Sequence, residues 1–279
     1  HIELDEGNKI YRVVNNKIEY DFTALRGDSI KKDLAKRDFT INALAIPHLH
    51  FDKIKKIKNK KYKITKNILI DPYQGVNDLE DRLIRVLGPG IFESDPIRLL
   101  RAIRFKVILN FDIEKNTEKK LFNNRKMIKN SAAERIRYEL IKIFETTKIN
   151  KTVDYMENKL KMLSTIFPEI KKYKKLNSFF SSEINIWTHS LDMFSLYQKF
   201  SKEKIVDYFP DKKKSLLMKF VILFHEYDHL DFNKQDCEIT RNVEEIFRDL
   251  KFSNKEIKYI MKLVKYNINV FSLYSDQNL

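Results

Sequence analysis

The distribution of glycine and proline divides this chain into two parts. All five glycines lie at or before Gly90, and beyond it only Pro96, Pro168 and Pro210 interrupt the sequence. Glycine and proline are the residues that most often mark turns and end helices. Strands and tight turns are therefore expected in the first 90 or so residues, and a helical array with few breaks is expected after them.

Hydrophobic periodicity supports this division. Beyond residue 90, apolar residues recur at intervals of three and four residues, as in Ile97, Leu100 and Ile103, which predicts amphipathic helices. Before it, two short stretches of β-branched and aromatic residues, 11–14 and 17–25, are separated by an Asn-Asn pair. This pattern predicts a β-hairpin.

Two further segments of the first part have a weaker pattern. Residues 64–70 run into an Asp-Pro dipeptide, and we expect a short strand that closes into a turn. The lysine-rich residues 53–62 interrupt the apolar pattern and predict an exposed loop or a solvated face.

The composition favours a polyanionic partner in the cytoplasm. Lys and Arg number 54 against 39 Asp and Glu, which gives a formal net charge of +15. Nucleic acid is the expected partner because it offers phosphates to these cations, although a biased genomic composition would produce the same excess. The single cysteine, Cys237, suits a reducing cytoplasm. No apolar run approaches the roughly 18 to 20 residues that span a bilayer, so no membrane partner is expected.

The segment from Asp95 to Phe105 carries an unusual row of arginines. Arg98, Arg101 and Arg104 repeat every three residues, so they lie along one slowly rotating face of a helix whose other side is apolar. Guanidiniums in a row repel one another unless an anion lies among them. Because the planar fork of arginine binds phosphate oxygens bidentately, a triphosphate or an RNA backbone is the expected anion.

Asp95 has two interpretations. It precedes Pro96, and proline is favoured at the first helical position, so Asp95 can be an ordinary N-cap. Alternatively, Asp95 and Arg98 are three residues apart and share a face, so one acceptor and one fork of donors can together read the edge of a base. Arg37 and Asp38 lie beside an expected helix start and, taken alone, are equally consistent with a capped surface helix.

Four segments resemble, in order and spacing, the signature segments of the class II tRNA nucleotidyltransferases and bacterial poly(A) polymerases. They read KRDFTINALA, IDPYQGVNDLEDRLIRVL, DPIRLLRAIRF and SAAERIRYEL. The resemblance covers roughly residues 10–145 and implies an α+β fold. It would consist of the remnant of a polymerase-β-like nucleotidyltransferase head in residues 1–90, a nucleotide-selecting and RNA-binding neck in 91–150, and a helical body and tail in 151–279.

The resemblance also implies functional roles. Arg37 matches an arginine that contacts the incoming nucleotide. Asp95 and Arg98 match a pair that selects cytosine or adenine by Watson-Crick-like hydrogen bonds, and Arg101 and Arg104 match further nucleotide-contacting arginines. The implied reaction adds CMP and AMP from CTP and ATP to the 3′ end of tRNA. An A-only or CC-only adding enzyme, or a poly(A) polymerase, would share every one of these segments.

The metal-binding motifs of the family are not in this sequence. The family's reaction uses a Gly-Gly loop for the triphosphate and an Asp-x-Asp pair for two Mg²⁺ ions, and neither motif occurs here. We therefore expect the chain to be a fragment whose Mg²⁺ is held by upstream residues. Residues 21–26, DFTALR, resemble the strand that follows those motifs in the family, which implies that Asp21 is a third, catalytic carboxylate. Alternatively, Asp21 is a strand-end residue that is solvated or paired with Arg26. Ser94 replaces the glutamate that commonly precedes the selecting aspartate. A noncatalytic RNA-binding remnant is the competing interpretation.

Two segments of the second half, around His189 and His225, resemble the first elements of an HD-type phosphohydrolase region. In such a site an adjacent His and Asp bind a metal, but Glu226 takes the place of that Asp here. With Asp228 and His229 nearby, a metal site is one prediction. The prediction that we favour is a degenerate helical body in which these histidines are satisfied by packing.

Overall fold

The computed structural model divides into two compact units, His1–Pro89 and Gly90–Leu279. Each unit is described on its own. The described residues are 2–5, 10–15, 18–57, 61–178, 181–202, 212–227 and 243–275. Within these ranges, no helix combines the length and the hydropathy that a membrane crossing requires.

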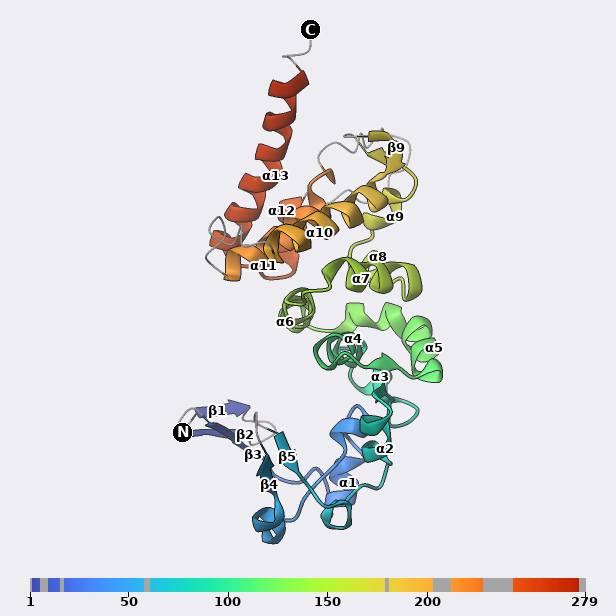
Figure 1. Ribbon diagram of the computed structural model, residues 1–279, viewed down its shortest axis with the longest axis vertical. Helices are drawn as coiled ribbons and strands as arrows, with labels where there is room; N and C mark the ends of the chain where they lie inside the picture. Colours follow the sequence, from blue (N-terminus) through green and yellow to red (C-terminus); the bar gives the residue numbers. More distant parts are fainter. Residues whose placement is uncertain are drawn as a thin grey trace. The chain divides into compact units, whose positions relative to one another are not determined.

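The first unit consists of short strands and short helices (Figure 1). Its elements are β1 Ile2–Asp5, β2 Ile10–Asn15, β3 Ile18–Phe22, α1 Ile30–Leu34, η1 Thr40–Asn42, η2 His48–Lys53, β4 Lys55–Ile57, β5 Lys61–Lys63, η3 Lys66–Ile68, α2 Gly75–Glu80 and β6 Leu83–Ile84. Strands β1, β2 and β3 form an antiparallel sheet in that order. Val13 lies opposite Tyr20, so the predicted hairpin is confirmed, while its turn lies outside the described residues.

Two segments of this unit differ from the loop and the strand that were expected. The lysine-rich segment contains a second antiparallel hairpin, β4 with β5, so the loop alternative is wrong, because lysine is compatible with exposed edge strands. The strand expected over 64–70 is interrupted by the 3-10 helix η3, since Lys66 and Asn67 have low strand propensity. Only Ile70 of that segment makes a strand-like bridge, with Ala45.

A buried carboxylate ties two of the signature segments together in the first unit. Asp78 on α2 accepts a hydrogen bond from Thr40 Oγ1 at 2.6 Å and from Arg85 Nε at 3.0 Å. Gly75 allows the two segments to approach closely, because a Cβ built there would lie 2.2 Å from the Thr40 carbonyl oxygen. These contacts hold the backbone that follows Arg37.

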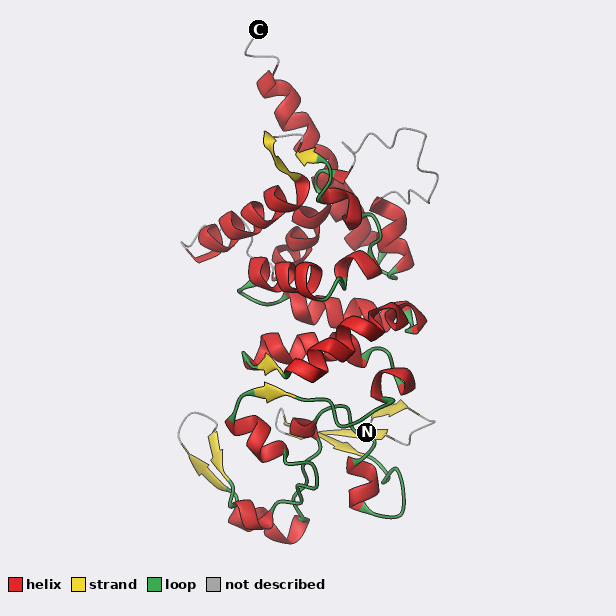
Figure 2. Ribbon diagram, turned by 90° about the vertical axis from the view of Figure 1, so that its right-hand side faces the viewer, coloured by secondary structure: helices red, strands yellow, loops and turns green. Residues whose placement is uncertain are grey.

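The second unit is mainly helical, with short strands in the segments that connect some of its helices (Figure 2). Its elements are α3 Ile91–Ser94, α4 Arg98–Leu109, β7 Asp112–Ile113, α5 Lys115–Asn124, η4 Arg125–Asn130, α6 Ala133–Phe144, α7 Ile149–Asp154, the π-helix η5 Tyr155–Lys159, α8 Leu163–Ile166, α9 Ile170–Tyr173, β8 Asn177–Ser178, β9 Ser181–Asn185, α10 Ile186–Lys202, α11 Lys212–Phe224, α12 Val243–Asp249 and α13 Asn254–Ser275. The antiparallel pair β8 and β9 departs from the all-α prediction, because asparagine and serine are weak helix formers.

The apolar face predicted for α4 is confirmed. Leu99, Leu100, Ala102 and Ile103 are buried, and α4 packs against α6. Further along the unit, the rings of Phe144 and Phe220 stack with centroids 4.5 Å apart. Because its apolar side is packed in this way, α4 is held in place, and so are the backbone positions of its arginines.

Candidate functional site

Arg37 lies just after α1 and is half-buried. Its Nη2 donates to Asp33 Oδ2 at 2.8 Å, and Asp33 is buried. The neighbouring Asp38 Oδ1 accepts from the Phe39 backbone N–H and from Asn42 Nδ2 at 3.1 and 3.0 Å. The capped surface helix considered for Arg37 and Asp38 is not present, because Asp38 is buried and the 3-10 helix η1 that follows has Phe39 as its N-cap, with no hydrogen bond from a capping side chain.

Asp21 pairs with Arg12, not with Arg26. The two residues face each other on β3 and β2, and Arg12 donates from Nε to Oδ1 at 2.7 Å and from Nη2 to Oδ2 at 2.8 Å. These hydrogen bonds lower the pKa of the Asp21 carboxyl. The carboxylate is exposed to solvent and fully ionised at neutral pH.

Asp95 lies at the junction of α3 and α4. Its backbone is extended, with φ −156° and ψ 94°, and α4 begins at Arg98 without a side-chain cap. The prediction of a helix that starts at Pro96 is therefore wrong by two residues. Instead, Asp95 receives two parallel hydrogen bonds from Arg135 on α6, Nη1 to Oδ1 at 3.0 Å and Nη2 to Oδ2 at 2.9 Å.

Arg98 lies beside this pair. Its Nε is 3.9 Å from Asp95 Oδ2, and its Nη1 donates to the Ile91 carbonyl at 3.3 Å and to Ser94 Oγ at 3.2 Å. The Arg98 and Asp95 side chains are 13% and 27% exposed. The structure therefore brings together the acceptor and the donor fork that the sequence placed on one face, and it adds Arg135.

The remaining arginines of α4 have different surroundings. Arg104 Nε lies 2.9 Å from Glu139 Oε2 on α6, and both side chains are largely buried. Arg101 is partly exposed and lies over the ring of Phe105 at 5.5 Å. Because Glu139 neutralises one guanidinium and Asp95 lies near another, the row of arginines does not require an external anion for its own stability.

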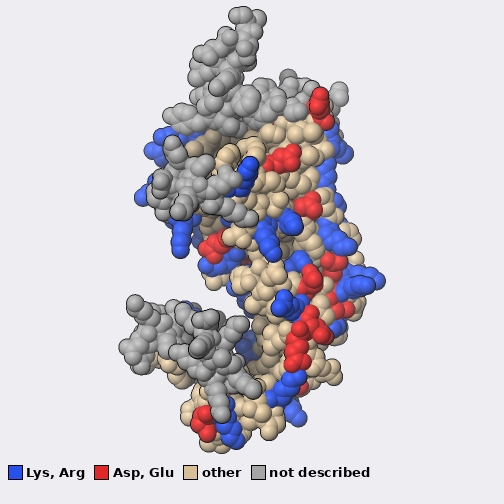
Figure 3. Space-filling model, in the orientation of Figure 1, with Lys and Arg blue, Asp and Glu red and all other residues tan. Residues whose placement is uncertain are grey.

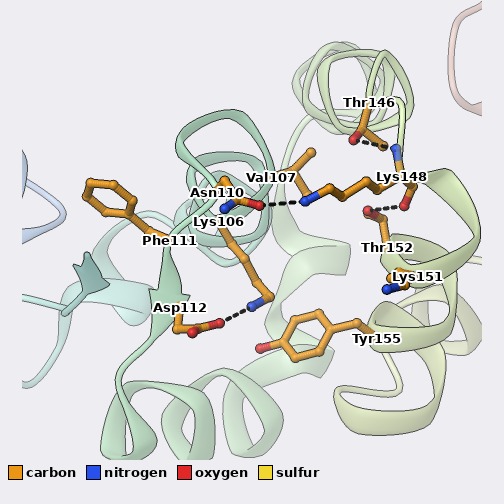
Figure 4. Close-up of a pocket in the computed structure, with 10 residues that line it drawn as sticks. All are labelled: Lys106, Val107, Asn110, Phe111, Asp112, Thr146, Lys148, Lys151, Thr152 and Tyr155. Carbon is orange, nitrogen blue, oxygen red and sulfur yellow. Dashed lines mark hydrogen bonds and ion pairs between the residues drawn. The ribbon is translucent and has the colours of Figure 1, made fainter. Parts of the chain in front are cut away.

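A pocket lies at the opposite end of α4 (Figure 4). Its volume is about 360 Å³. Lys106 Nζ donates to Asp112 Oδ1 at 2.8 Å and lies 4.9 Å from the Tyr155 ring centroid. Lys148 Nζ donates to Asn110 Oδ1 at 2.9 Å. Two of the pocket's lysines are thus occupied by protein acceptors.

The two histidines singled out in the second half lie next to each other. The ring centroids of His189 and His225 are 5.1 Å apart, and Nε2 of each lies 3.7 Å from Glu226 Oε1. His225 Nδ1 is 2.7 Å from the Ile222 carbonyl oxygen, so this nitrogen carries the proton in the neutral ring. Asp228 and His229 lie outside the described residues.

Two family models match the chain. The model described as Poly A polymerase head domain matches residues 5–85. The model described as Probable RNA and SrmB- binding site of polymerase A matches residues 110–174. The two matches lie in the expected order on either side of α4.

The chain belongs to the poly(A) polymerase and tRNA nucleotidyltransferase family.

Named relatives within the family differ in the nucleotides they add. The chain is 37% identical over 144 residues to a CC-adding tRNA nucleotidyltransferase of Geobacter sulfurreducens, which is 51% of this chain and 30% of that protein. It is 29% identical over 248 residues to an A-adding tRNA nucleotidyltransferase of Aquifex aeolicus, which is 88% of this chain and 27% of that protein. The chain thus spans about a third of each of these two relatives or less.

Solved structures of family members share the fold. The Thermotoga maritima CCA-adding enzyme complexed with tRNA matches with a TM-score of 0.64 and 22% identity, covering 99% of this chain and 58% of that one. A CCA-adding enzyme complexed with CTP matches with a TM-score of 0.66 and 21% identity, also covering 99% of this chain and 58% of that one. The fold expected from the signature segments, a polymerase-β-like head remnant followed by helices, is confirmed.

The sequence did not single out two residues that complete the α4 site in this tRNA nucleotidyltransferase family member. Arg135 and Glu139 on α6 contact Asp95 and Arg104. Both belong to the segment SAAERIRYEL, whose resemblance to the family was the available signal. Their spacing of four residues, one helical turn, places them on the same side of α6.

Proposed function

We propose that this chain is the nucleotide-selecting and RNA-binding part of a cytoplasmic tRNA nucleotidyltransferase that transfers CMP or AMP from CTP or ATP to the tRNA 3′ end. The observation that carries the proposal is the arrangement at the start of α4. There the Asp95 carboxylate and the Arg98 guanidinium lie 3.9 Å apart and both are partly exposed.

The chemistry of this pair suits cytosine and adenine. On the Watson-Crick edge, both bases present an amino donor next to a ring-nitrogen acceptor. A carboxylate accepts only, and a guanidinium donates only. Asp95 would therefore accept from the amino group while Arg98 donates to the ring nitrogen. Uracil and guanine present a carbonyl acceptor next to an N–H donor. Their carbonyl would face the Asp95 carboxylate, so two acceptors would meet, and their N–H would face the Arg98 guanidinium, so two donors would meet.

The other arginines would contribute to nucleotide binding in different ways. Arg37 is 40% exposed and anchored by Asp33, so its guanidinium is held in position to contact a nucleotide. Arg101 keeps partial exposure on α4 and is proposed to contact the nucleotide directly. Arg104 is 15% exposed and paired with Glu139, and it would contribute by fixing α4 against α6.

The described residues do not by themselves fit a magnesium site of the two-carboxylate type. Asp21 is occupied by Arg12 through two hydrogen bonds, and no group of three candidate ligands that includes Asp21 occurs within the described ranges. Mg²⁺ would activate the 3′-hydroxyl and stabilise the pyrophosphate, and we propose that residues outside this chain hold it. Asp21 stays a candidate third carboxylate.

The experiment that tests the function is extension of three tRNAs by the full-length gene product. The tRNAs end before CCA, after C and after CC, and CTP and ATP are supplied separately and together. Completion of all three tRNAs identifies a CCA-adding enzyme. Extension confined to C, or to the final A, identifies a CC-adding or A-adding enzyme, and long A tails identify a poly(A) polymerase.

A noncatalytic RNA-binding protein is the competing function from another class. It predicts that the full-length gene product binds all three tRNAs and extends none of them. That result would contradict nucleotidyl transfer and retain RNA binding.

A metal-dependent phosphohydrolase is a second candidate, favoured by one observation. One ligand atom from each of His189, His225 and Glu226 lies within 4.8 Å of the others, which is compatible with three protein ligands around a transition metal. Elemental analysis of purified protein shows whether this cluster binds a metal. A stoichiometric transition metal that is lost in the His225→Ala variant would support the phosphohydrolase function. Absence of metal after incubation with zinc would contradict that function.

A further inference from the structure

A pocket in the second unit gathers several cationic side chains around one buried carboxylate. It has a volume of about 560 Å³ and is formed by η4, the turn after η5, α8 and α9. The carboxylate is Glu157, and the cationic side chains are Arg125, Lys126, Lys129, Lys161, Lys171 and Lys174. Lysine and arginine side chains are also spread over the face that Figure 3 shows, with acidic side chains among them. Positive charge alone therefore does not distinguish this pocket from the rest of the surface.

Two lysines of the pocket share a single carboxylate oxygen. Glu157 Oε1 lies 3.7 Å from the Nζ atoms of both Lys161 and Lys174, and Glu157 Oε2 accepts a hydrogen bond from the Ser164 backbone N–H at 2.9 Å. Among the described residues, no other carboxylate pairs with either lysine. One negative charge faces two ammonium groups, so the two lysines together hold their last proton less tightly than two separately paired lysines would.

The surroundings of Lys174 favour a neutral amine. Burial, together with the neighbouring Lys161, lowers the pKa of Lys174 below its usual value. Its Nζ also donates to Asn158 Oδ1, and a neutral amine keeps the hydrogens that this contact needs. The side chain is 32% exposed, so a small reagent in the pocket can reach the nitrogen.

The turn that carries Lys161 does not itself require a lysine. The residue has φ +53°, in the left-handed region that glycine adopts at much lower cost. Its backbone N–H donates to the Glu157 carbonyl at 3.1 Å, a contact that any residue except proline would make. What the lysine adds to this turn is a second ammonium group beside Lys174.

We propose that Lys174 is a reactive lysine that small acyl phosphates acylate in this pocket. The surrounding cations attract the dianionic phosphate group of the reagent, and the neutral amine is the nucleophile. The amine nitrogen forms a bond to the carbonyl carbon, and the bond from that carbon to the phosphate oxygen breaks. One proton passes from the nitrogen to the departing phosphate, so the products are an N-acyl lysine and hydrogen phosphate. Glu157 then pairs with Lys161 alone, and the charges balance.

The first test compares acetylation of Lys174 and of Lys106 in the full-length gene product. The Lys106 side chain is 25% exposed, close to the 32% of Lys174, but it has a carboxylate of its own, Asp112, at 2.8 Å. The protein is incubated with acetyl phosphate at neutral pH, unfolded, and treated with isotopically heavy acetic anhydride. Mass spectrometry of its peptides then gives the fraction of each lysine that acetyl phosphate modified. Lys174 should react about 3- to 10-fold faster than Lys106, because more of it is neutral.

The second test removes the neighbouring ammonium group. Lys161→Gly leaves Glu157 to Lys174 alone, so acetylation of Lys174 should become slower by about 3-fold or more. Lys251→Gly is the matched control, because Lys251 is also left-handed, with φ +59°, but lies on the turn after α12 and does not line the pocket. It should leave the rate at Lys174 unchanged. Glycine suits both turns, so neither substitution should lower the unfolding temperature.

A second reagent separates the reactivity of the amine from the attraction of phosphate. N-hydroxysuccinimidyl acetate acylates amines but carries no phosphate group. It should also modify Lys174 faster than Lys106. The preference for Lys174 should be larger with acetyl phosphate, and inorganic phosphate should reduce it only for that reagent.

Equal rates at Lys174 and Lys106 with both reagents would overturn the inference. An unchanged rate at Lys174 in Lys161→Gly would overturn it as well, because the neighbouring ammonium group would then have no effect. A preference for Lys174 that is seen with the ester and not with acetyl phosphate would overturn the assignment to acyl phosphates. None of these measurements involves nucleotide addition or tRNA, so a failure of the proposed function would leave this inference standing.

Discussion

Arg135 donates two parallel hydrogen bonds to the Asp95 carboxylate, at 3.0 and 2.9 Å, although 40 residues separate them in the sequence. This bidentate contact fixes the plane of the carboxylate that is proposed to read the base. In the full-length gene product, Arg135→Ala should therefore reduce the discrimination of CTP and ATP against UTP and GTP by about tenfold, corresponding to about 1.4 kcal/mol. Arg137→Ala is the matched control, because Arg137 lies on the same helix but over Phe252. Equal discrimination in both variants would contradict the positioning role.

Gly75 should be essential for the stability of the first unit. A Cβ at this position would lie 2.2 Å from the Thr40 carbonyl oxygen and 2.8 Å from its carbon. Backbone atoms must shift to accommodate it, so Gly75→Ala should lower the free energy of unfolding by about 1 to 3 kcal/mol or more. Gly88→Ala is the control, because beyond the adjacent residues of the chain no atom lies within 4 Å of a Cβ built there. Urea denaturation of both variants measures the difference, and equal stability would refute the close approach.

The buried side chain of Lys219 should make the free energy of unfolding depend on pH. Its Nζ donates to the Phe144 and Thr146 carbonyl oxygens at 2.6 and 2.8 Å, and burial lowers its pKa to about 8. Between about pH 8 and about pH 10.5 the unfolded chain therefore binds more protons at this residue than the folded chain. The contribution of Lys219 to stability should rise through this range and be lost as the pH falls through about 8.

The Lys219→Met variant isolates this contribution. The difference in free energy of unfolding between the unmodified chain and the variant should increase by about 2 kcal/mol from the lower to the upper limit of that pH range. Other titrating groups are common to both proteins and cancel in the difference. A difference that does not change with pH would show that the pKa of Lys219 is not lowered.

Substitutions of Asp21 and of its partner Arg12 test the prediction that Asp21 acts in catalysis. If Asp21 acts in catalysis, Asp21→Asn should reduce kcat of the full-length gene product by at least about tenfold, whereas Arg12→Gln leaves the carboxylate in place and should change kcat little. If the residue serves only the cross-strand pair, both substitutions should have the same small effect. Single-turnover kinetics with saturating tRNA and nucleotide distinguish these results.

The features that could be predicted from the sequence are local ones. The β2–β3 hairpin and the apolar side of α4 follow from side-chain periodicity over fewer than about a dozen residues. The arginines of α4 were recognised because their spacing and the family resemblance agree. The hairpin of β4 and β5 was missed because its lysines carry no apolar alternation.

The features that could not be predicted depend on contacts between distant segments. The partner of Asp95 comes from α6, and nothing in the sequence around Asp95 indicates which cation will reach it. The left-handed conformation of Lys161 could not be predicted either, because lysine does not mark a left-handed turn in a sequence as glycine does. Both depend on tertiary packing, which determines where helices end and which side chains meet.

The most direct test of the account is base selection by Asp95→Asn and Arg98→Lys variants of the full-length gene product. An asparagine amide offers both a donor and an acceptor where the carboxylate offers acceptors alone, and a lysine lacks the arginine fork. The account predicts that each variant binds tRNA as tightly as the unmodified protein but adds CMP, AMP, UMP and GMP with reduced preference. Unchanged selection of CTP and ATP in both variants would contradict the assignment of this pair as the element that reads the base.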